Sequence, residues 1–144
     1  MAVATGPEKK LSTIMKVEMH DFDPGATTVT AVGWRAVSGF RTFMARLMRT
    51  IGTSATTFDI AVATDSSGGG ALAVITHAVG SEPDAVGDEL FLECSIENMR
   101  ETLATATHWS ARISCATNTD EMVVTTIEAD PQHPRTGLTA DIVA

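Results

Sequence analysis

Several stretches of the chain alternate apolar and polar residues, which is the pattern of β-strands with one buried face. The alternation runs through residues 14–20, 56–64 and 89–94, where every second side chain would face a core. Residues 26–37 are rich in Thr and Val, so they predict a further strand with Trp34 on its core face. The pattern indicates a protein built mainly from short β-strands.

Clusters of turn-forming residues divide these strands. Asp23-Pro24-Gly25 follows the first strand and places proline at the first central position of a turn. The cluster at residues 65–70 ends in three glycines, and it predicts a hairpin between 56–64 and the apolar return strand 71–77. Antiparallel pairing of neighbouring strands is therefore expected.

Residues 40–51 fit two different elements. Their apolar residues follow the i, i+3, i+4 spacing of an amphipathic helix: Phe40, Phe43, Met44, Leu47, Met48 and Ile51. Gly39 and Gly52, however, bracket the segment at the length of a strand, which would pair with 56–64 across residues 52–55 as a hairpin. Helix and strand both remain open on the residues alone, and the resemblance described below favours a long, twisted strand.

The last part of the sequence predicts a short helix and a second hairpin. Ser95 can cap a helix over residues 96–104. Residues 109–116 and 122–129 both alternate and are joined by a polar link, so they are predicted to pair with each other. One face of the first arm is apolar: Trp109, Ala111, Ile113 and Cys115. Prolines at 131 and 134 then end the strand.

These elements predict an antiparallel β-sandwich or barrel of about six to eight strands with one short helix. We expect a single β domain over residues 14–130. Residues 1–13 are small, polar and interrupted by Pro and Gly, which predicts a flexible N-terminal arm. Residues 131–144 are predicted to form a C-terminal arm that lies on a neighbour.

Composition and charge narrow the class of partner. The chain has 144 residues, no tyrosine and a net charge of −8, so it repels nucleic acid and lacks the side chain that sugar-binding surfaces favour. Residues 1–50 carry seven basic and four acidic residues, whereas the rest carries three and fourteen. No apolar run is long enough to cross a membrane. The expected partners are proteins.

The segment Met1 to Lys10 has no apolar core of a secretory signal, so we expect synthesis in the cytoplasm. Two cysteines, Cys94 and Cys115, lack metal-site spacing and lie in apolar segments, which predicts buried free thiols.

Candidate chemistry is sparse. The histidines are scattered singly at His20, His77, His108 and His133. His20-Asp21-Phe22-Asp23 is the best candidate for gathering an ion, although a solvated loop explains it better; His77 is expected to be half buried. The remaining acids indicate surface charge: Asp84, Asp88, Glu89, Glu93, Glu97 and Glu101. The sequence therefore predicts no enzyme, with no catalytic residue, no cofactor and no metal site.

Turn-and-strand motifs occur at six places between residue 33 and the C-terminal tail. They are Gly33-Trp34-Arg35 leading to Phe43-Met44-Ala45; Met48-Arg49-Thr50-Ile51-Gly52; Ala63-Thr64-Asp65 with its glycines; Ala85-Val86-Gly87-Asp88 running into Leu92-Glu93-Cys94; Ala116-Thr117-Asn118-Thr119-Asp120-Glu121; and Gly137-Leu138-Thr139-Ala140-Asp141. Through these motifs the chain resembles small β-sandwich proteins of tailed bacteriophages that decorate or cement the head.

The resemblance implies a virion structural protein on the capsid exterior, made in the cytoplasm of the host bacterium. Its expected partners are the major capsid protein, whose subunits it would bridge, and neighbouring copies of itself. Two alternatives remain open: a head-tail connector or tail-tube protein, and a small β-sandwich module that binds a ligand. A virion coat component needs no active site, in agreement with the sparse chemistry.

Overall fold

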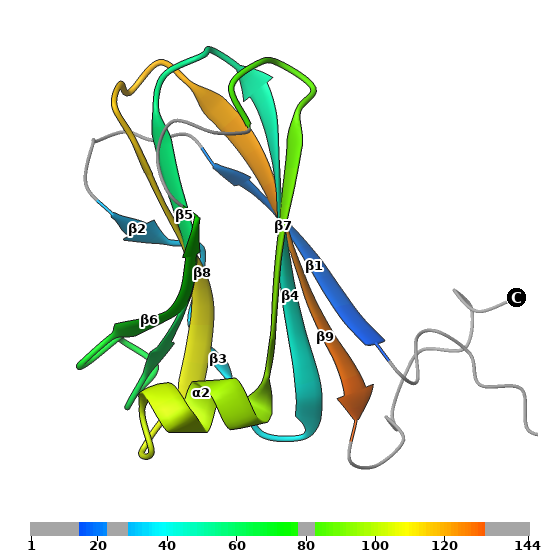
Figure 1. Ribbon diagram of the computed structural model, residues 1–144, viewed down its shortest axis with the longest axis vertical. Coiled ribbons are helices and arrows are strands. Elements are labelled where there is room, and N and C mark those ends of the chain that lie inside the picture. The colour runs from blue at the N-terminus through cyan, green and yellow to red at the C-terminus, as the bar shows by residue number, and fades with distance from the viewer. Residues whose placement is uncertain (1–14, 23–28, 78–82, 132–144) are drawn as a thin grey trace, which may run out of the picture.

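The computed structural model describes residues 15–22, 29–77 and 83–131, which form two antiparallel sheets packed face to face (Figure 1). The first sheet has the order β1 (Met15–Phe22), β9 (Glu121–Pro131), β4 (Phe40–Ile51) and β7 (Glu89–Ser95). The second has the order β2 (Thr30–Ala31), β8 (His108–Cys115), β5 (Thr56–Ala63) and β6 (Leu72–His77), and β3 (Arg35–Ala36) also pairs with β8. One helix, α2 (Ile96–Thr102), lies across an end of the sandwich. The predicted β-sandwich with one short helix is confirmed.

Residues 40–51 form a strand, as favoured, and not a helix. β4 lies inside the first sheet and pairs with β7 on one side and β9 on the other. Its residues Phe43, Ala45 and Leu47 are fully buried and point toward the second sheet. The backbone N–H and C=O groups of β4 bond to the strands on both sides, so β4 joins β7 to β9 within the sheet. A helix at this position would leave both neighbouring strands without these partners.

The predicted hairpin between 40–51 and 56–64 is wrong. β4 belongs to the first sheet, whereas β5 pairs with β6 and β8 in the second. Residues 52–55 therefore cross from one sheet to the other. Gly52 allows this change of direction with a φ of +86°, in the left-handed region that a side chain disfavours.

The hairpin predicted for 109–116 and 122–129 is also wrong. β8 pairs with β5, and β9 pairs with β1 and β4, so the link between them crosses between the sheets as well. The two strands still face each other through the core, where Cys115 Sγ lies 4.0 Å from Met122 Sδ. Alternation fixed which face of each strand is buried, but it carries no information on which edge finds a partner.

The hairpin over the glycine cluster is confirmed, because β5 pairs with β6. The carboxylate of Asp65 organises its turn by accepting hydrogen bonds from the backbone N–H groups of Ser67 and Gly69, at 2.8 and 3.0 Å. The expected helix cap is present too: Ser95 Oγ accepts from the Asn98 N–H, and the Asn98 side chain accepts from the Ser95 N–H. Helix α2 ends at Thr102, two residues before the predicted end.

Residues 26–37 do not form the continuous strand that was predicted. Of this stretch, the structure describes residues 29–37, which contain only the two-residue strands β2 and β3. Trp34 lies between them and is not part of the core cluster. Its indole packs on Gly68, where an added Cβ would come within 2.5 Å of Trp34 Nε1. Trp34 was expected on the core face of a strand, but its indole instead packs against the turn at residues 65–70.

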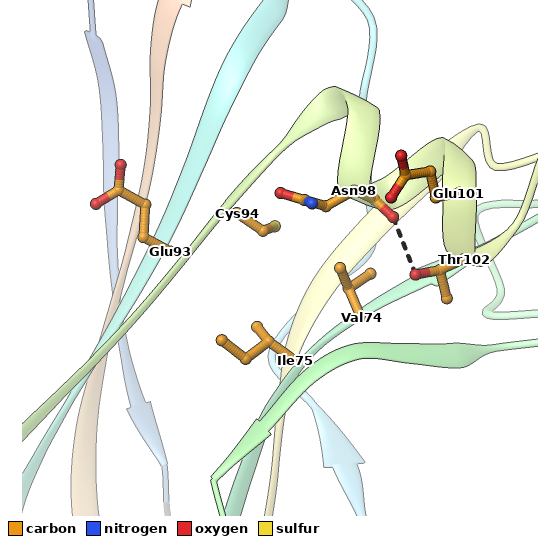
Figure 2. A pocket seen from close by; sticks show the side chains of 7 residues that line it. All are labelled: Val74, Ile75, Glu93, Cys94, Asn98, Glu101 and Thr102. Atoms are coloured by element: carbon orange, nitrogen blue, oxygen red, sulfur yellow. Dashed lines mark hydrogen bonds between the residues drawn. The ribbon is translucent and has the colours of Figure 1, made fainter.

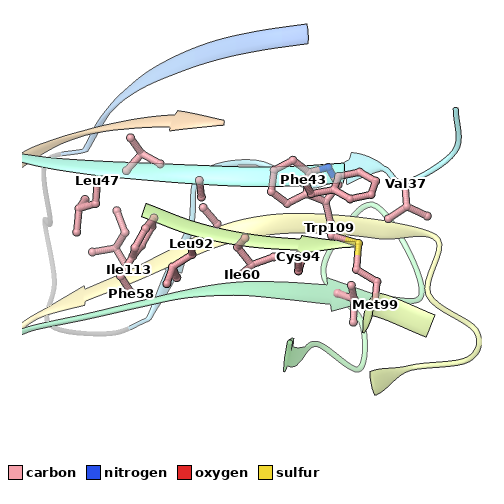
Figure 3. Close-up of a cluster of buried hydrophobic side chains, with 14 of the residues drawn as sticks. Val37, Phe43, Leu47, Phe58, Ile60, Leu92, Cys94, Met99, Trp109 and Ile113 are labelled. Atoms are coloured by element: carbon pink, nitrogen blue, oxygen red, sulfur yellow. The ribbon is translucent and has the colours of Figure 1, made fainter. Parts of the chain in front are cut away.

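The core lies between the two sheets (Figure 3). Trp109 packs edge-on against Phe43, with ring centroids 5.2 Å apart. The predicted apolar face of β8 is confirmed, because Trp109, Ala111, Ile113 and Cys115 are all buried. The domain limits 14–130 and the two arms, 1–13 and 131–144, remain predictions, since both arms lie outside the described residues apart from Pro131 at the end of β9.

Candidate interaction surface

The outer face of the first sheet carries large apolar side chains on all four strands. The strand register places Val17 of β1 beside Ile127 of β9, and Ile127 beside Met44 of β4. A second row runs from Met19 through Thr125 to Arg46 and ends at Phe91 of β7. Residues directly opposite in antiparallel strands project to the same side of a sheet, so these rows form one surface.

We call this surface the Met-rich face. It comprises Met15, Val17, Met19, Met44, Met48, Phe91, Val123 and Ile127, and therefore four of the chain's seven methionines. Val17, Met19 and Phe91 are 52%, 71% and 55% exposed. Contiguous apolar patches on a protein surface commonly mark contact sites, and methionine is enriched there because its side chain adapts its shape.

The outer face of the second sheet is different in character. Its outward positions on β5 and β8 carry small or polar side chains: Thr57, Asp59, Ala61, Ser110, Arg112 and Ser114. Asp59 and Arg112 pair across the strands through two hydrogen bonds of 2.8 and 2.7 Å. Asp59, Ala61 and Ser110 are themselves buried, so these positions do not form an apolar contact surface like that of the first sheet.

One ion pair interrupts the Met-rich face. Arg46 Nε donates to Glu89 Oε2 at 3.0 Å, and its Nη2 also contacts Glu89 and, at 3.6 Å, Met48 Sδ. The hydrogen bonds from Arg46 lower the pKa of Glu89, and those to Glu89 raise the pKa of Arg46. Arg46 and Glu89 therefore compensate each other's charge, which lowers the cost of covering this part of the face with a partner.

A polar cluster closes the sandwich at β1. Arg35 of β3 donates from Nε to Glu18 Oε2 at 2.6 Å, and Lys16 Nζ lies 2.9 Å from Glu18 Oε1. Desolvation of Glu18 opposes ionisation, but the hydrogen bonds from Arg35 and Lys16 prevail and lower its pKa to about 2. The carboxylate is thus held ionised as an ion-pair partner and is a poor proton acceptor, so this cluster ties the two sheets together.

His20 joins this cluster within the strand predicted for residues 14–20, and the solvated loop expected for residues 20–23 does not begin there. The residue lies in β1, and its Nε2 is 2.5 Å from Arg35 Nη2. Burial, and then the charge of Arg35, lower the pKa of His20. Asp23, the last member of the predicted ion-binding motif, lies outside the described residues. Across residues 15–22, 29–77 and 83–131, no group of three or more His, Cys, Asp or Glu side chains could hold a metal.

A buried ion pair joins the two links that cross between the sheets. Arg49 is fully buried and donates to Asp120, to the Ser54 carbonyl at 2.7 Å and to the Pro83 carbonyl at 3.1 Å. Asp120 also accepts from the Ser54 N–H at 2.9 Å. Arg49 shares the inward face of β4 with Phe43 and Leu47, and this position in the alternation is the signal that the sequence analysis missed.

The other candidate residues lie where the sequence predicted. Asp84, Glu89, Glu93, Glu97 and Glu101 are exposed, and Asp88 is half buried. His77 is half buried in β6. Cys94 and Cys115 are buried free thiols, as predicted. In the described part of the chain, no helix has the length and apolar character needed to cross a membrane.

A groove lies between the edges of the two sheets, where β6 and β7 are adjacent (Figure 2). Its volume is about 400 Å³. Val74, Ile75 and Cys94 line its apolar part, and α2 covers one side with Asn98, Glu101 and Thr102. Glu93 contributes from β7, and its side chain points away from the helix. The groove holds an apolar floor with carboxylates at its rim.

Comparison with known proteins gives no family. No protein-family model matches the chain, and no curated protein matches it. Among solved structures, one described as "Bacillus endospore appendages form a novel family of disulfide-linked pili" aligns with a TM-score of 0.48 and 17% identity, covering 92% of this chain and 97% of that one. The SPBc2 prophage-derived protein YomS aligns with a TM-score of 0.41 and 13% identity, covering 82% and 96%. At such low values neither structure identifies a family or a function for this chain.

Proposed function

We propose that this protein is a structural component of a tailed-bacteriophage particle that decorates the capsid exterior and stabilises it by bridging major capsid protein subunits. The Met-rich face is the observation that carries the proposal. It is broad, apolar and formed by regular strands, so it suits a flat contact with another protein better than a small ligand. The resemblance of the turn-and-strand motifs to phage head proteins supports the same role.

The rest of the molecule fits a structural role. The sandwich is held by a packed core, the Arg49–Asp120 pair and the Glu18–Arg35 pair, which fix the relative position of the two sheets. A coat component needs such a rigid body to present one face repeatedly around a symmetric shell. Weak individual contacts suffice, because repetition raises the effective concentration of each further contact.

The stoichiometry of this protein in purified particles tests the proposal. Gel densitometry against the major capsid protein, with identification by mass spectrometry, should give a ratio near one to one or one to three. A ratio of a few per cent would favour the head-tail connector or tail-tube alternative. Absence from particles would overturn the virion role.

Truncation tests the part assigned to the arms. Chains lacking residues 1–13 or 135–144 are expected to fold normally but to bind capsids more weakly than the full chain. Circular dichroism checks the fold, and co-sedimentation with capsids that lack the protein measures binding. Full binding by both truncated chains would show that the arms do not contribute.

A further inference from the structure

The groove between β6 and β7 lies between two strand edges that have no partner in the described part of the chain. There β7 pairs with β4 alone, and β6 pairs with β5 alone. An unpaired edge presents a row of N–H and C=O groups that can bind an added strand. Backbone pairing along β7 would direct alternate side chains of such a strand into the groove.

The chemistry of the groove defines the peptide that fits it. Val74, Ile75 and Cys94 offer an apolar floor. Glu101 lies on the helix side, and Glu93 projects to the outer face of the first sheet, opposite Met44. Because side chains alternate along a strand, a suitable peptide has a basic and an apolar residue on one side and a second basic residue on the other.

We infer that this groove binds residues 9–11 of a neighbouring copy of the chain as a strand added to β7. Lys9-Lys10-Leu11 has the required order. Leu11 and Lys9 would face the groove floor and Glu101, while Lys10 would face Glu93 on the other side. Lys9 and Lys10 are two of the chain's three lysines. The rim of the groove is formed by part of residues 83–102, a segment that contains six acidic residues and one arginine. Opposite charge thus supports the pairing.

The strand order indicates that the peptide comes from a neighbour. Met15, Ala129, Thr42 and Ser95 form one row across the first sheet, with β1 at one edge and β7 at the other. An added strand beyond β7 lies four strand spacings from Met15, about 19 Å. Leu11 precedes Met15 by four residues, which span at most about 14 Å. Leu11 of the same copy therefore falls short of the groove.

Exchange of this segment between copies would be head-to-tail. The segment leaves one copy beside β1 and enters the next beside β7, so every copy can both give and receive a strand. Such heterologous contacts produce rings or extended arrays. The inference rests on the proposed role as a repeating coat component, and it adds how neighbouring copies are linked.

Disulfide trapping tests the predicted neighbours. A tagged Lys10→Cys chain is mixed with an untagged Glu93→Cys chain at high protein concentration under mild oxidation. We expect a covalent heterodimer on a non-reducing gel, more abundant than with a Glu121→Cys partner, which places an exposed thiol at the other end of the sheet. The natural thiols are buried and give little background.

A charge exchange supplies the second readout. Sedimentation should show less self-association for Lys9→Glu/Lys10→Glu and for Glu93→Lys/Glu101→Lys than for the unchanged 15.2 kDa chain, with mixing of the two variants restoring it. Trapping no better than the Glu121→Cys control, or a disulfide within one chain carrying both cysteines, would overturn the inference. The stoichiometry in purified particles is a separate measurement, so a failure of the strand exchange can be distinguished from a failure of the proposed function.

Discussion

Arg49 and Asp120 form a buried ion pair across 71 positions of the sequence, and this pair fixes where the chain passes between the two sheets. Arg49 ends the inward alternation of β4, and Asp120 lies in the link between β8 and β9. Neither side chain is more than 5% exposed. A charge in this position must be matched locally, because water cannot solvate it.

Replacing Asp120 by alanine should lower the free energy of unfolding by about 3–5 kcal/mol, since it leaves the Arg49 guanidinium buried without its counter-charge. Urea denaturation followed by tryptophan fluorescence measures the change. Glu89→Ala, which removes the solvent-exposed partner of Arg46, is the control and should change stability little. The double variant Arg49→Met/Asp120→Leu should recover part of the loss, because it removes both charges. Equal stability of Asp120→Ala and Glu89→Ala would contradict this role.

Gly52→Ala should destabilise the protein more than Gly39→Ala. The two glycines have similar φ angles, +86° and +94°, so the backbone strain of about 1–3 kcal/mol is common to both. A Cβ at Gly52 would lie 1.9 Å from Asp120 Oδ1, whereas nothing lies within 4 Å at Gly39. The difference in denaturation midpoint between the two variants therefore reports the contact with Asp120. Equal midpoints would show that the link relaxes around the added methyl group.

The sequence predicted the fold class because alternation identifies buried faces locally. It was ambiguous at β4, where Phe43 and Leu47 face the core while Met44 and Met48 belong to the Met-rich face. Apolar residues on both sides of a strand imitate helical spacing. The ambiguity and the candidate surface thus have the same cause, and the surface was missed because each strand supplies only one to three of its residues.

Strand partners could not be predicted for a similar reason. The links 52–55 and 116–120 are short and polar, which suits a hairpin as well as a crossing between sheets. The crossing is selected by Arg49, Ser54 and Asp120, which meet only in three dimensions. The Glu18–Arg35 pair and the groove between β6 and β7 are likewise formed by residues that are distant in the sequence and meet only in the folded chain.

Acid should destabilise the protein through Glu18. Its pKa lies at about 2 instead of 4.5 because Arg35 and Lys16 overcome the effect of desolvation. Below pH 4.5 Glu18 becomes protonated in the unfolded chain, whereas in the folded chain it stays ionised down to about pH 2. The free energy of unfolding therefore decreases as the pH is lowered from 4.5 to 2. Above pH 4.5 this contribution is complete. Glu18→Gln should show a shallower decline in urea midpoint between pH 4.5 and 2, and identical declines would contradict the assignment.

Both thiols should resist labelling in the folded protein. Burial, with a smaller effect of Glu93, raises the pKa of Cys94 to about 12, and burial also raises the pKa of Cys115. The reactive thiolate is therefore scarce at pH 8. A chromogenic disulfide reagent should react slowly with the folded protein in buffer. In urea it should react rapidly with both thiols of each chain. Glu93→Gln should remain slow, because burial is the larger cause. Fast labelling of the native chain would contradict the packing of β7 and β8.

Val17→Lys should weaken attachment to capsids without unfolding the protein. Val17 is 52% exposed at the β1 end of one row of the Met-rich face, so the lysine is solvated in the free chain but must be desolvated in a contact. Leu72→Lys is the control, since Leu72 is 47% exposed on β6 in the other sheet. Both changes should alter the free energy of unfolding by about 0.5 kcal/mol or less. Co-sedimentation with capsids should fall at least tenfold for Val17→Lys alone, and equal losses for the two variants would remove the Met-rich face from the attachment site.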